Sequence, residues 1–196
     1  SLVNKSVLCL FAHQDDEYFV APFILRERKN GNIVSCVYLT DGASYGTDSS
    51  LRNEESLEAL SSLGVSRSDV IFLGTEKGFR DSTAMARCQE IFDALNEKLD
   101  NKTHFRVYCP AWEGGHVDHD AVHLVALAFA KSRRLISETW QFSLYNARFA
   151  PRGLFRVMSP IHPATKTRTV RVSFLMALKF AFLCSFYRSQ WRTWLG

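Results

Sequence analysis

Apolar residues along the first 145 positions fall into short continuous runs separated by longer stretches with helical spacing. The short runs are typical of buried strands and predict strands over 6–11, 33–40, 69–73, 105–111 and 140–145. Between them, apolar side chains recur three or four positions apart, which predicts helices over 17–30, 51–63, 83–99 and 118–134.

This regular alternation of strands and helices predicts an α/β fold. We expect a Rossmann-like, three-layer α/β/α arrangement around a mostly parallel sheet. The chain of 196 residues, 46% of them hydrophobic, has the size and composition of an ordinary globular domain. Ligands bind at the carboxyl ends of parallel strands, so the residues that follow each strand are the first candidates for a functional site.

One cluster of polar residues follows the first predicted strand and reads Ala12-His13-Gln14-Asp15-Asp16-Glu17. Carboxylates this close together repel each other unless a cation neutralises them. A divalent metal ion would do so and would use His13 as a ligand. The alternative is helix capping by Asp15 or Asp16, which explains an acidic residue but leaves His13 without a role.

A second cluster follows the fourth predicted strand and contains Gly114-Gly115-His116-Val117-Asp118-His119. His116 and His119 lie three positions apart at the start of a helix, so both can reach one centre. His119 and His123 form an alternative metal pair, although His123 lies one turn further from the strand ends and is more simply a helix-face residue. The remaining histidines are interpreted as structural or solvated, namely His104 and His162.

The two clusters meet only if the strands lie side by side in a parallel sheet. Together they offer two or three imidazole nitrogens and a carboxylate, with no cysteine, which is typical of an open catalytic zinc site. We therefore predict a mononuclear Zn²⁺ site, at which another divalent metal such as Fe²⁺ is an alternative. A dinucleotide-binding protein would instead need a G-x-G-x-x-G turn after the first strand, where this chain has acidic residues.

The two clusters resemble the motifs of the PIG-L or LmbE-like family of N-acetylglucosaminyl deacetylases. The family pattern is A-H-P-D-D-E after the first strand and H-P-D-H before a later helix, and here Gln14 and Val117 replace the two prolines. The resemblance extends over roughly residues 5–147, with further matches at Thr40-Asp41-Gly42, Arg52, Glu55, Leu63-Gly64-Val65 and Phe72-Leu73-Gly74 followed by Asp81.

The family resemblance implies a role for each matching position. The implied metal ligands are His13, Asp16 and His119. Asp15 would be the general base, and His116, oriented by Asp118, would be the general acid or would stabilise the oxyanion. The implied substrate-binding residues are Arg52 and, more weakly, Asp41 and Asp81.

The reaction that the resemblance implies is hydrolysis of an amide. Metal-activated water would remove the N-acetyl group from an N-acetylglucosaminyl-type sugar conjugate. Two alternatives stay open: a metal-dependent amide hydrolase with a non-sugar substrate, and a non-catalytic family member that binds a ligand in the cleft.

The charge of the chain changes after residue 138. Up to this point there are 15 basic and 20 acidic residues, whereas residues 139–196 contain 9 basic residues and no acidic one. This predicts contact with an anionic partner, either a phosphate-bearing substrate or a membrane surface, unless the basic residues only pair with the acidic part of the chain.

The apolar run at 170–186 is interrupted by Arg171 and Lys179, and aromatic residues follow it. It predicts a helix that either lies on an anionic membrane or packs on the domain or in an oligomer interface. We therefore divide the chain into a deacetylase domain, 1–150, and a C-terminal extension, 151–196, that packs on it.

The cysteines and the N-terminus suggest a cytoplasmic protein with optional peripheral membrane contact. The five cysteines form no C-x-x-C pair, and those within strands are expected to be buried free thiols, which suits a reducing compartment. The first residues are polar and lead directly into a strand, so no leader peptide is expected. No nucleic-acid partner is expected, and an oligomer that forms through the C-terminal helix stays open as an alternative.

Overall fold

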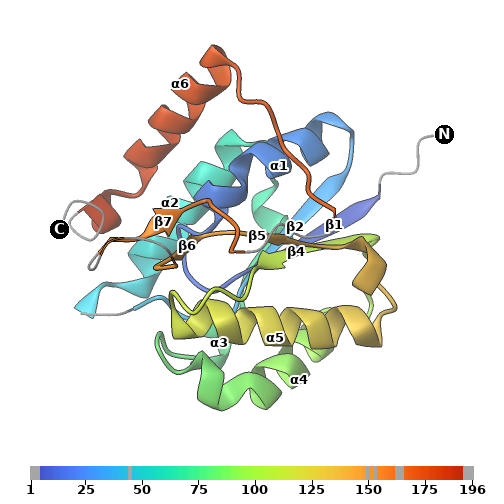
Figure 1. The fold of residues 1–196 in the computed structure, drawn as a ribbon. Coiled ribbons are helices and arrows are strands. Elements are labelled where there is room, and N and C mark those ends of the chain that lie inside the picture. The colour runs from blue at the N-terminus through green and yellow to red at the C-terminus, as the bar shows by residue number, and fades with distance from the viewer. Residues whose placement is uncertain (1–4, 44–45, 149–150, 152–153, 162–165, 192–196) are drawn as a thin grey trace.

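A five-stranded parallel sheet forms the centre of the molecule (Figure 1). The computed structural model describes residues 5–43, 46–148, 151, 154–161 and 166–191. The strands are β1 (Ser6–Phe11), β2 (Ile33–Tyr38), β3 (Val70–Phe72), β4 (Arg106–Pro110) and β5 (Thr139–Phe142). Their order is β3-β2-β1-β4-β5, and every neighbouring pair is parallel.

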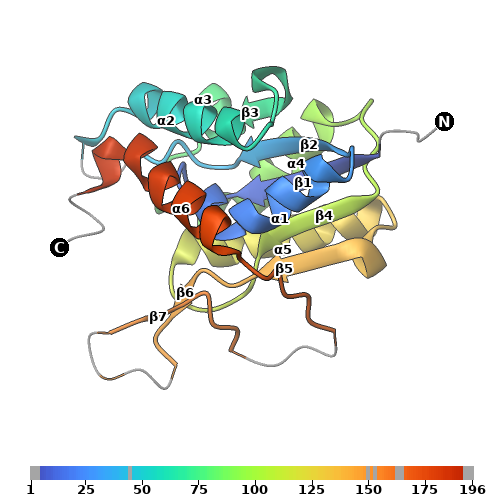
Figure 2. The same ribbon diagram turned by 90° about the horizontal axis from the view of Figure 1, so that it is seen from above.

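Helices cover both faces of this sheet, which gives the expected three-layer α/β/α fold (Figures 1 and 2). One face carries α1 (Glu17–Lys29), α2 (Ser49–Ser62) and α6 (Phe174–Leu183). The other carries α3 (Leu73–Lys77), α4 (Cys88–Lys98) and α5 (Val117–Ser132). Along β1, Leu8 and Leu10 point to one core and Val7, Cys9 and Phe11 to the other. Burial on both faces explains why the strands read as continuous apolar runs.

Helix α6 and the residues after it pack on the domain. Phe180, Leu183 and Tyr187 are buried in the core that α1 and α2 also line. The Tyr187 hydroxyl donates a hydrogen bond to Glu17 Oε1 at 2.9 Å, and the Ser189 hydroxyl donates one to Glu55 Oε2 at 2.5 Å. Within the part of the chain that the structure describes, no helix has the length and apolar character needed to cross a membrane.

The fifth strand ends earlier than the sequence predicts. It was expected to reach position 145, but the backbone N–H of Leu144 donates to the Glu113 carboxylate at 2.7 Å instead of to a neighbouring strand. The next residues form β6 (Tyr145–Asn146), which pairs in antiparallel fashion with β7 (Arg156–Val157). The Glu113 side chain, from the loop after β4, therefore ends β5 at Phe142.

Helix boundaries also differ from prediction where side chains capture backbone groups. The helix expected over 83–99 begins as a 3-10 turn, because Ala84 N donates to Asp118 Oδ1 at 3.1 Å, and becomes α-helical only at Cys88. The helix expected over 170–186 begins after Ser173, whose hydroxyl accepts from Met176 N. Short 3-10 turns occupy Arg67–Asp69, Ala84–Arg87, Ile136–Glu138, Cys184–Phe186 and Arg188–Gln190.

Candidate metal centre and active site

The two polar clusters meet at the carboxyl edge of the sheet, because β1 and β4 are neighbours. Three side chains come closest there. His13, Asp16 and His119 each offer one nitrogen or oxygen, and these donor atoms all lie within 4.8 Å of one another. All three residues are buried. Two loops far apart in the sequence therefore present one donor set to a common point.

The chemistry of this donor set fits a divalent metal ion. His13 Nδ1 lies 3.3 Å from His119 Nε2, which in turn lies 3.1 Å from Asp16 Oδ1. Two imidazole nitrogens that face each other this closely need a proton or a cation between them. Two imidazoles and one carboxylate are also the ligands of open zinc-type sites.

Asp16 is held in place by the loop that it closes. It lies directly before α1 but makes no side-chain capping bond; instead its Oδ2 accepts from Ala12 N and His13 N, both at 2.9 Å. Burial alone would raise the pKa of Asp16, but the charges and hydrogen bonds of His119 and His13 together outweigh it and hold that pKa well below the usual range. Helix capping therefore does not explain this carboxylate.

His13 is flanked by carboxylates on its other side as well. Its Nε2 lies 3.2 Å from Asp118 Oδ2 and 3.6 Å from Asp81 Oδ2. Burial lowers the pKa of His13, but the hydrogen bond to Asp118 and the charges of Asp16, Asp81 and Asp118 outweigh it and raise the pKa to about 9. A carboxylate on one nitrogen fixes the ring and directs the other nitrogen to a metal position.

Asp118 contacts two of the histidines. It was expected to orient His116, and its carboxylate contacts His13 and accepts from Ser82 N and Ala84 N at 2.6 and 3.1 Å. His116 is fixed by the backbone, because Asp118 N donates to His116 Nδ1 at 3.2 Å as α5 begins. The His116 ring lies 4.7 Å from the ring of His13 and 5.2 Å from that of His119.

Asp15 has an unusual backbone conformation in the first loop. Its φ of 150° is rare for a residue with a side chain, and such strain is often found at functional sites. Arg52 supports this loop: its guanidinium donates to Gln14 O at 2.8 Å and to Gly42 O, and lies 3.4 Å from Asp15 Oδ1. Arg52 is only 4% exposed, and its guanidinium is used for contacts within the protein.

Asp41 and Asp81 lie differently with respect to the cluster. Asp41 Oδ1 accepts from Ala43 N at 3.1 Å and from Asp81 N at 2.9 Å, so it joins two loops. Asp81 lies closer to the candidate centre. One carboxylate oxygen of Asp81 and one ring nitrogen each of His13 and His116 all lie within 4.8 Å of one another and form a second candidate donor group. The structure therefore brings Asp81 to the candidate centre and leaves Asp41 as a support behind it.

The other histidines that the structure describes, His104 and His123, lie outside both candidate donor groups. His123 is buried, and its Nδ1 is hydrogen-bonded to the Pro110 carbonyl at 3.0 Å, so it ties α5 to β4. His104 lies outside the site, where burial, helped by Lys102 and Arg133, lowers its pKa to about 4. His162 lies outside the described residues.

Sequence reasoning missed the residues that close the other side of the site. The Tyr145 ring lies 5.4 Å from the ring of His119, although position 145 reads as an ordinary strand residue. Asp120 accepts from Glu113 N and Gly114 N and so holds the glycine loop. At Gly115 a Cβ would lie 2.2 Å from the Tyr145 carbonyl, so the glycine pair at 114–115 was the one available signal of this close approach.

Comparisons with known proteins support the deacetylase resemblance. Residues 8–130 match the family profile described as PIG-L, GlcNAc-PI de-N-acetylase. A comparison with curated proteins gives no match. The fold is similar to the zinc-inhibited form of teicoplanin deacetylase Orf2, with a TM-score of 0.70 at 16% identity over 95% of this chain and 85% of the other.

Two further solved structures share the fold. The A40926 pseudoaglycone deacetylase Dbv21 has a TM-score of 0.69 at 16% identity, covering 94% of this chain and 81% of the other. The N,N'-diacetylchitobiose deacetylase from Pyrococcus horikoshii has a TM-score of 0.62 at 19% identity, covering 98% and 74%. At these identities the likeness shows the fold, while the profile match over residues 8–130 shows the family. The chain belongs to the PIG-L family of de-N-acetylases.

Proposed function

We propose that this protein is a metal-dependent hydrolase that removes the N-acetyl group from an N-acetylglucosaminyl-type sugar conjugate. The observation that carries the proposal is the convergence of His13, Asp16 and His119 on one point. Asp15 directly precedes Asp16 in the sequence, and the His116 ring lies 4.7 Å from the ring of His13. The names of the similar structures, teicoplanin deacetylase and N,N'-diacetylchitobiose deacetylase, support a sugar-linked N-acetyl substrate.

His13, Asp16 and His119 would hold the ion, for which Zn²⁺ is the first candidate and Fe²⁺ an alternative. A bound divalent ion would lower the pKa of water from 15.7 to about 7 and polarise the acetyl carbonyl. Asp118 supports this assignment, since its carboxylate is hydrogen-bonded to His13 Nε2 and leaves Nδ1 directed at the other two ligands.

Asp15 is the proposed general base and takes the proton of the attacking water. The Arg52 guanidinium lies 3.4 Å from Asp15 Oδ1 and donates to the carbonyl of the preceding residue, Gln14. We therefore propose that Arg52 positions the base, in place of the direct substrate contact that the family resemblance implies. Asp81, which faces the centre, is the better candidate for contact with the sugar, and Asp41 supports the loop that carries it.

His116 is the proposed donor to the oxyanion. Burial and the nearby charges of His13 and His119 lower its pKa, which favours the neutral ring. Its Nδ1 accepts from Asp118 N, which leaves the ring proton on Nε2. An Nε2–H group can donate to the oxygen that becomes negative as the amide is attacked, and can then pass a proton to the departing amine.

The proposal is tested by separating the base from the ligand beside it. Asp15→Asn should retain the metal and lose about 10²–10⁴-fold in the rate of acetate release, which is the usual contribution of a general base. Asp16→Asn should lose the metal itself, because Asp16 Oδ1 is one of the three donor atoms. Metal content by elemental analysis and acetate release from a panel of N-acetylglucosaminyl conjugates are the two measurements.

The opposite pattern, with metal lost in Asp15→Asn and kept in Asp16→Asn, would reverse the assignment. Acetate release from simple N-acyl amides but from no sugar conjugate would favour the non-sugar amide hydrolase. Tight binding of the conjugates without any acetate release by the metal-loaded protein would favour a non-catalytic binding protein.

We also propose that the protein is cytoplasmic and that its residues 151–196 form an extension that contacts an anionic membrane. All five cysteines are free thiols, which suits a reducing compartment. On α6, Phe174 and Leu175 are each 77% exposed and Phe182 is 65% exposed, on a segment rich in basic residues and without acidic ones. Apolar residues beside basic ones suit an anionic lipid surface.

Sedimentation with vesicles tests this second proposal. We expect the protein to sediment with phosphatidylserine vesicles, to stay in the supernatant with phosphatidylcholine vesicles, and to be released as salt rises. Replacing Leu175 and Phe182 by serine should abolish sedimentation. Equal behaviour with both kinds of vesicle would leave α6 as a packing helix or an oligomer contact.

A further inference from the structure

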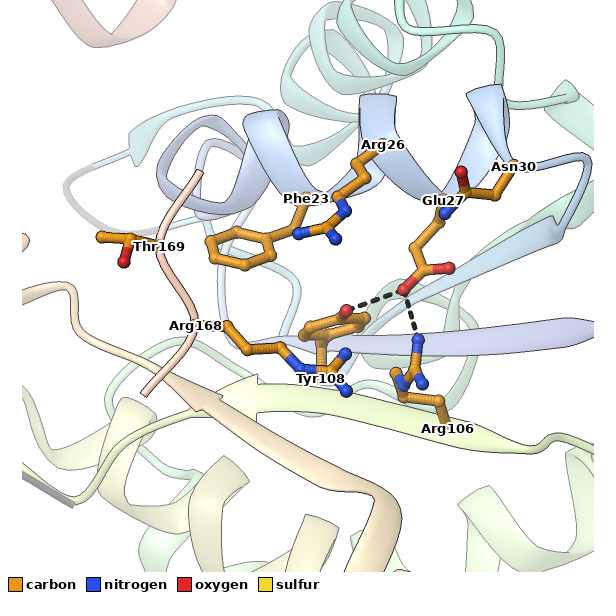
Figure 3. A pocket seen from close by; sticks show the side chains of 8 residues that line it. All are labelled: Phe23, Arg26, Glu27, Asn30, Arg106, Tyr108, Arg168 and Thr169. Atoms are coloured by element: carbon orange, nitrogen blue, oxygen red, sulfur yellow. Dashed lines mark hydrogen bonds and ion pairs between the residues drawn. The ribbon is translucent and has the colours of Figure 1, made fainter. Parts of the chain in front are cut away.

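A polar cavity of about 380 Å³ lies at the amino end of the sheet, at the opposite end of β4 from the candidate metal centre (Figure 3). Arg106, the first residue of β4, and Tyr108 form its floor. Arg26 and Glu27 reach it from the last turns of α1. Arg168 reaches it from the segment before α6. The cavity therefore joins three parts of the chain that are far apart in sequence.

The lining of this cavity carries excess positive charge. Among the residues that line it, Arg26, Arg106 and Arg168 outnumber the one acidic residue, Glu27, so three positive charges less one negative charge give a net charge of +2. Outside the lining, Arg106 also lies 3.5 Å from the partly exposed Glu138 carboxylate. Figure 3 shows the three guanidinium groups around the hollow, each coming from a different side. An uncompensated charge of this size around a concave polar space favours an anion.

Glu27 does not neutralise all three arginines, because its oxygens already have partners. Oε1 accepts from Arg106 at 2.7 Å and from the Tyr108 hydroxyl at 2.8 Å, and Oε2 accepts from Asn32 Nδ2 at 2.6 Å. Although burial alone would raise the pKa of Glu27, these hydrogen bonds lower it, so the group stays ionised and is committed to Arg106. The charges of Arg26 and Arg168 remain.

Arg26 and Arg168 have no acidic partner within the described ranges. Neither guanidinium makes an ion pair or a hydrogen bond there, and both side chains are exposed at the mouth of the cavity. Arg168 is nevertheless held in place, because its guanidinium carbon lies 3.9 Å from the centre of the Trp140 ring. Stacking on an aromatic ring leaves the edge of a guanidinium, with its N–H groups, available to a ligand.

We propose that this cavity is a binding site for a phosphate monoester. A phosphate monoester carries a charge of about −1.5 to −2 at pH 7, which matches the net charge of the lining. A planar guanidinium group can bind two phosphate oxygens at once, and Arg26 and Arg168 provide two such groups. The rings of Phe23 and Tyr108, 5.9 Å apart, offer an apolar surface for the organic part of the ester.

This site is independent of the proposed deacetylase function, because none of its residues belongs to the candidate metal centre. It also gives the basic C-terminal segment a specific role, since Arg168 comes from the region that has no acidic residue. The phosphate could belong to a free metabolite or to a lipid headgroup, and the chemistry that recognises it is the same.

Calorimetric titration with inorganic phosphate and phenyl phosphate tests the proposal. We expect saturable binding, tighter for phenyl phosphate because of the aromatic surface. Arg26→Ala and Arg168→Ala should each weaken it roughly tenfold, since each removes charge-assisted hydrogen bonds, and the double variant should show none. Arg106 is left intact, because its ion pair with the buried Glu27 makes it a poor choice for substitution.

Two control variants locate the binding. Lys131→Ala removes one exposed positive charge from the last turn of α5, outside the cavity, and should bind phosphate as the wild type does. His119→Ala alters the candidate metal centre and should also retain phosphate binding. Loss of binding in His119→Ala would assign the phosphate to the metal centre and overturn the proposal, as would an equal effect of Lys131→Ala.

Vesicles distinguish the two sources of phosphate. Binding to phosphatidic acid vesicles that depends on Arg26 and Arg168, without binding of soluble phosphate esters, would support the site with a lipid headgroup as its ligand. Absence of binding to phosphate, phenyl phosphate and phosphatidic acid vesicles alike would show that the cavity is only a solvated basic surface.

Discussion

Replacing Asp118 by asparagine probes how the proposed metal centre is supported. The Asp118 side chain is fully buried, and its Oδ2 lies 3.2 Å from His13 Nε2. The same carboxylate accepts from Ser82 N and Ala84 N, at 2.6 and 3.1 Å. Asparagine has nearly the same size, but it removes the negative charge and turns one acceptor into a donor, which cannot serve all three partners.

The expected cost follows from these contacts. A hydrogen bond to a charged group contributes about 1.5–3 kcal/mol, and no water screens this one because the side chain is fully buried. Loss of the outer partner of a metal-binding histidine typically weakens metal affinity by about 10–100-fold. Asp118→Asn should therefore bind Zn²⁺ about 10–100-fold more weakly, equivalent to roughly 1.4–2.7 kcal/mol.

Zinc affinity is measured by competition with a chromophoric chelator. Asp120→Asn is the matched control: this carboxylate is also buried on α5, but it accepts from Glu113 N and Gly114 N and has no contact with His13. It should alter the glycine loop and leave the zinc affinity close to that of the wild type. Equal affinities for Asp118→Asn and Asp120→Asn would refute the idea that Asp118 supports the metal through His13.

Two further predictions concern stability. Tyr187→Phe removes the hydroxyl that donates to the buried Glu17 at 2.9 Å, and should lower the free energy of unfolding by about 1–2 kcal/mol in urea denaturation; an unchanged midpoint would contradict it. Burial, together with Lys102 and Arg133, lowers the pKa of His104 from 6.5 to about 4, so the unfolded chain binds a proton in this range that the folded chain does not. The stability contributed by His104 is therefore present above pH 6.5 and lost as pH falls toward 4. The melting temperature should fall less steeply over this range in His104→Gln than in the wild type, whereas parallel curves would count against it.

The parts of the fold that depend on hydrophobic periodicity were predictable from the sequence. β1 spans Ser6–Phe11 as expected, and the sheet is parallel because helices follow its strands and bury both of its faces. The two clusters at 12–17 and 112–119 could also be placed at one edge, because the carboxyl ends of parallel strands meet there. His13, Asp16 and His119 converge for this reason.

Contacts made by individual side chains with distant backbone groups could not be predicted in this way. The Asp118 carboxylate binds Ala84 N and so delays the start of α4, and Glu113 binds Leu144 N and ends β5 early. Each of these bonds joins segments about 30 residues apart. Hydrophobic periodicity carries no information on such bonds, which depend on the finished tertiary structure.

The arginines illustrate the same limit. The family resemblance implies that Arg52 contacts the substrate, and only the fold shows that it is buried and hydrogen-bonded to the Gln14 carbonyl in the Asp15 loop. The basic character of the C-terminal segment was visible from its composition. Only the fold shows that Arg168 of this segment lines the same cavity as Arg26 of α1 and Arg106 of β4. Charge alone predicted an anionic partner but gave no indication of the cavity at which we propose that it binds.

Acetate release by metal-stripped protein, before and after addition of zinc, is the most direct test that His13, Asp16 and His119 hold an ion required for deacetylation. We expect no turnover of N-acetylglucosaminyl conjugates without metal and full recovery when one zinc ion is bound per chain. His119→Ala, which removes one of the three donor atoms, should neither retain zinc nor recover activity. Full activity of the metal-free protein, or zinc binding by His119→Ala equal to that of the wild type, would contradict this claim.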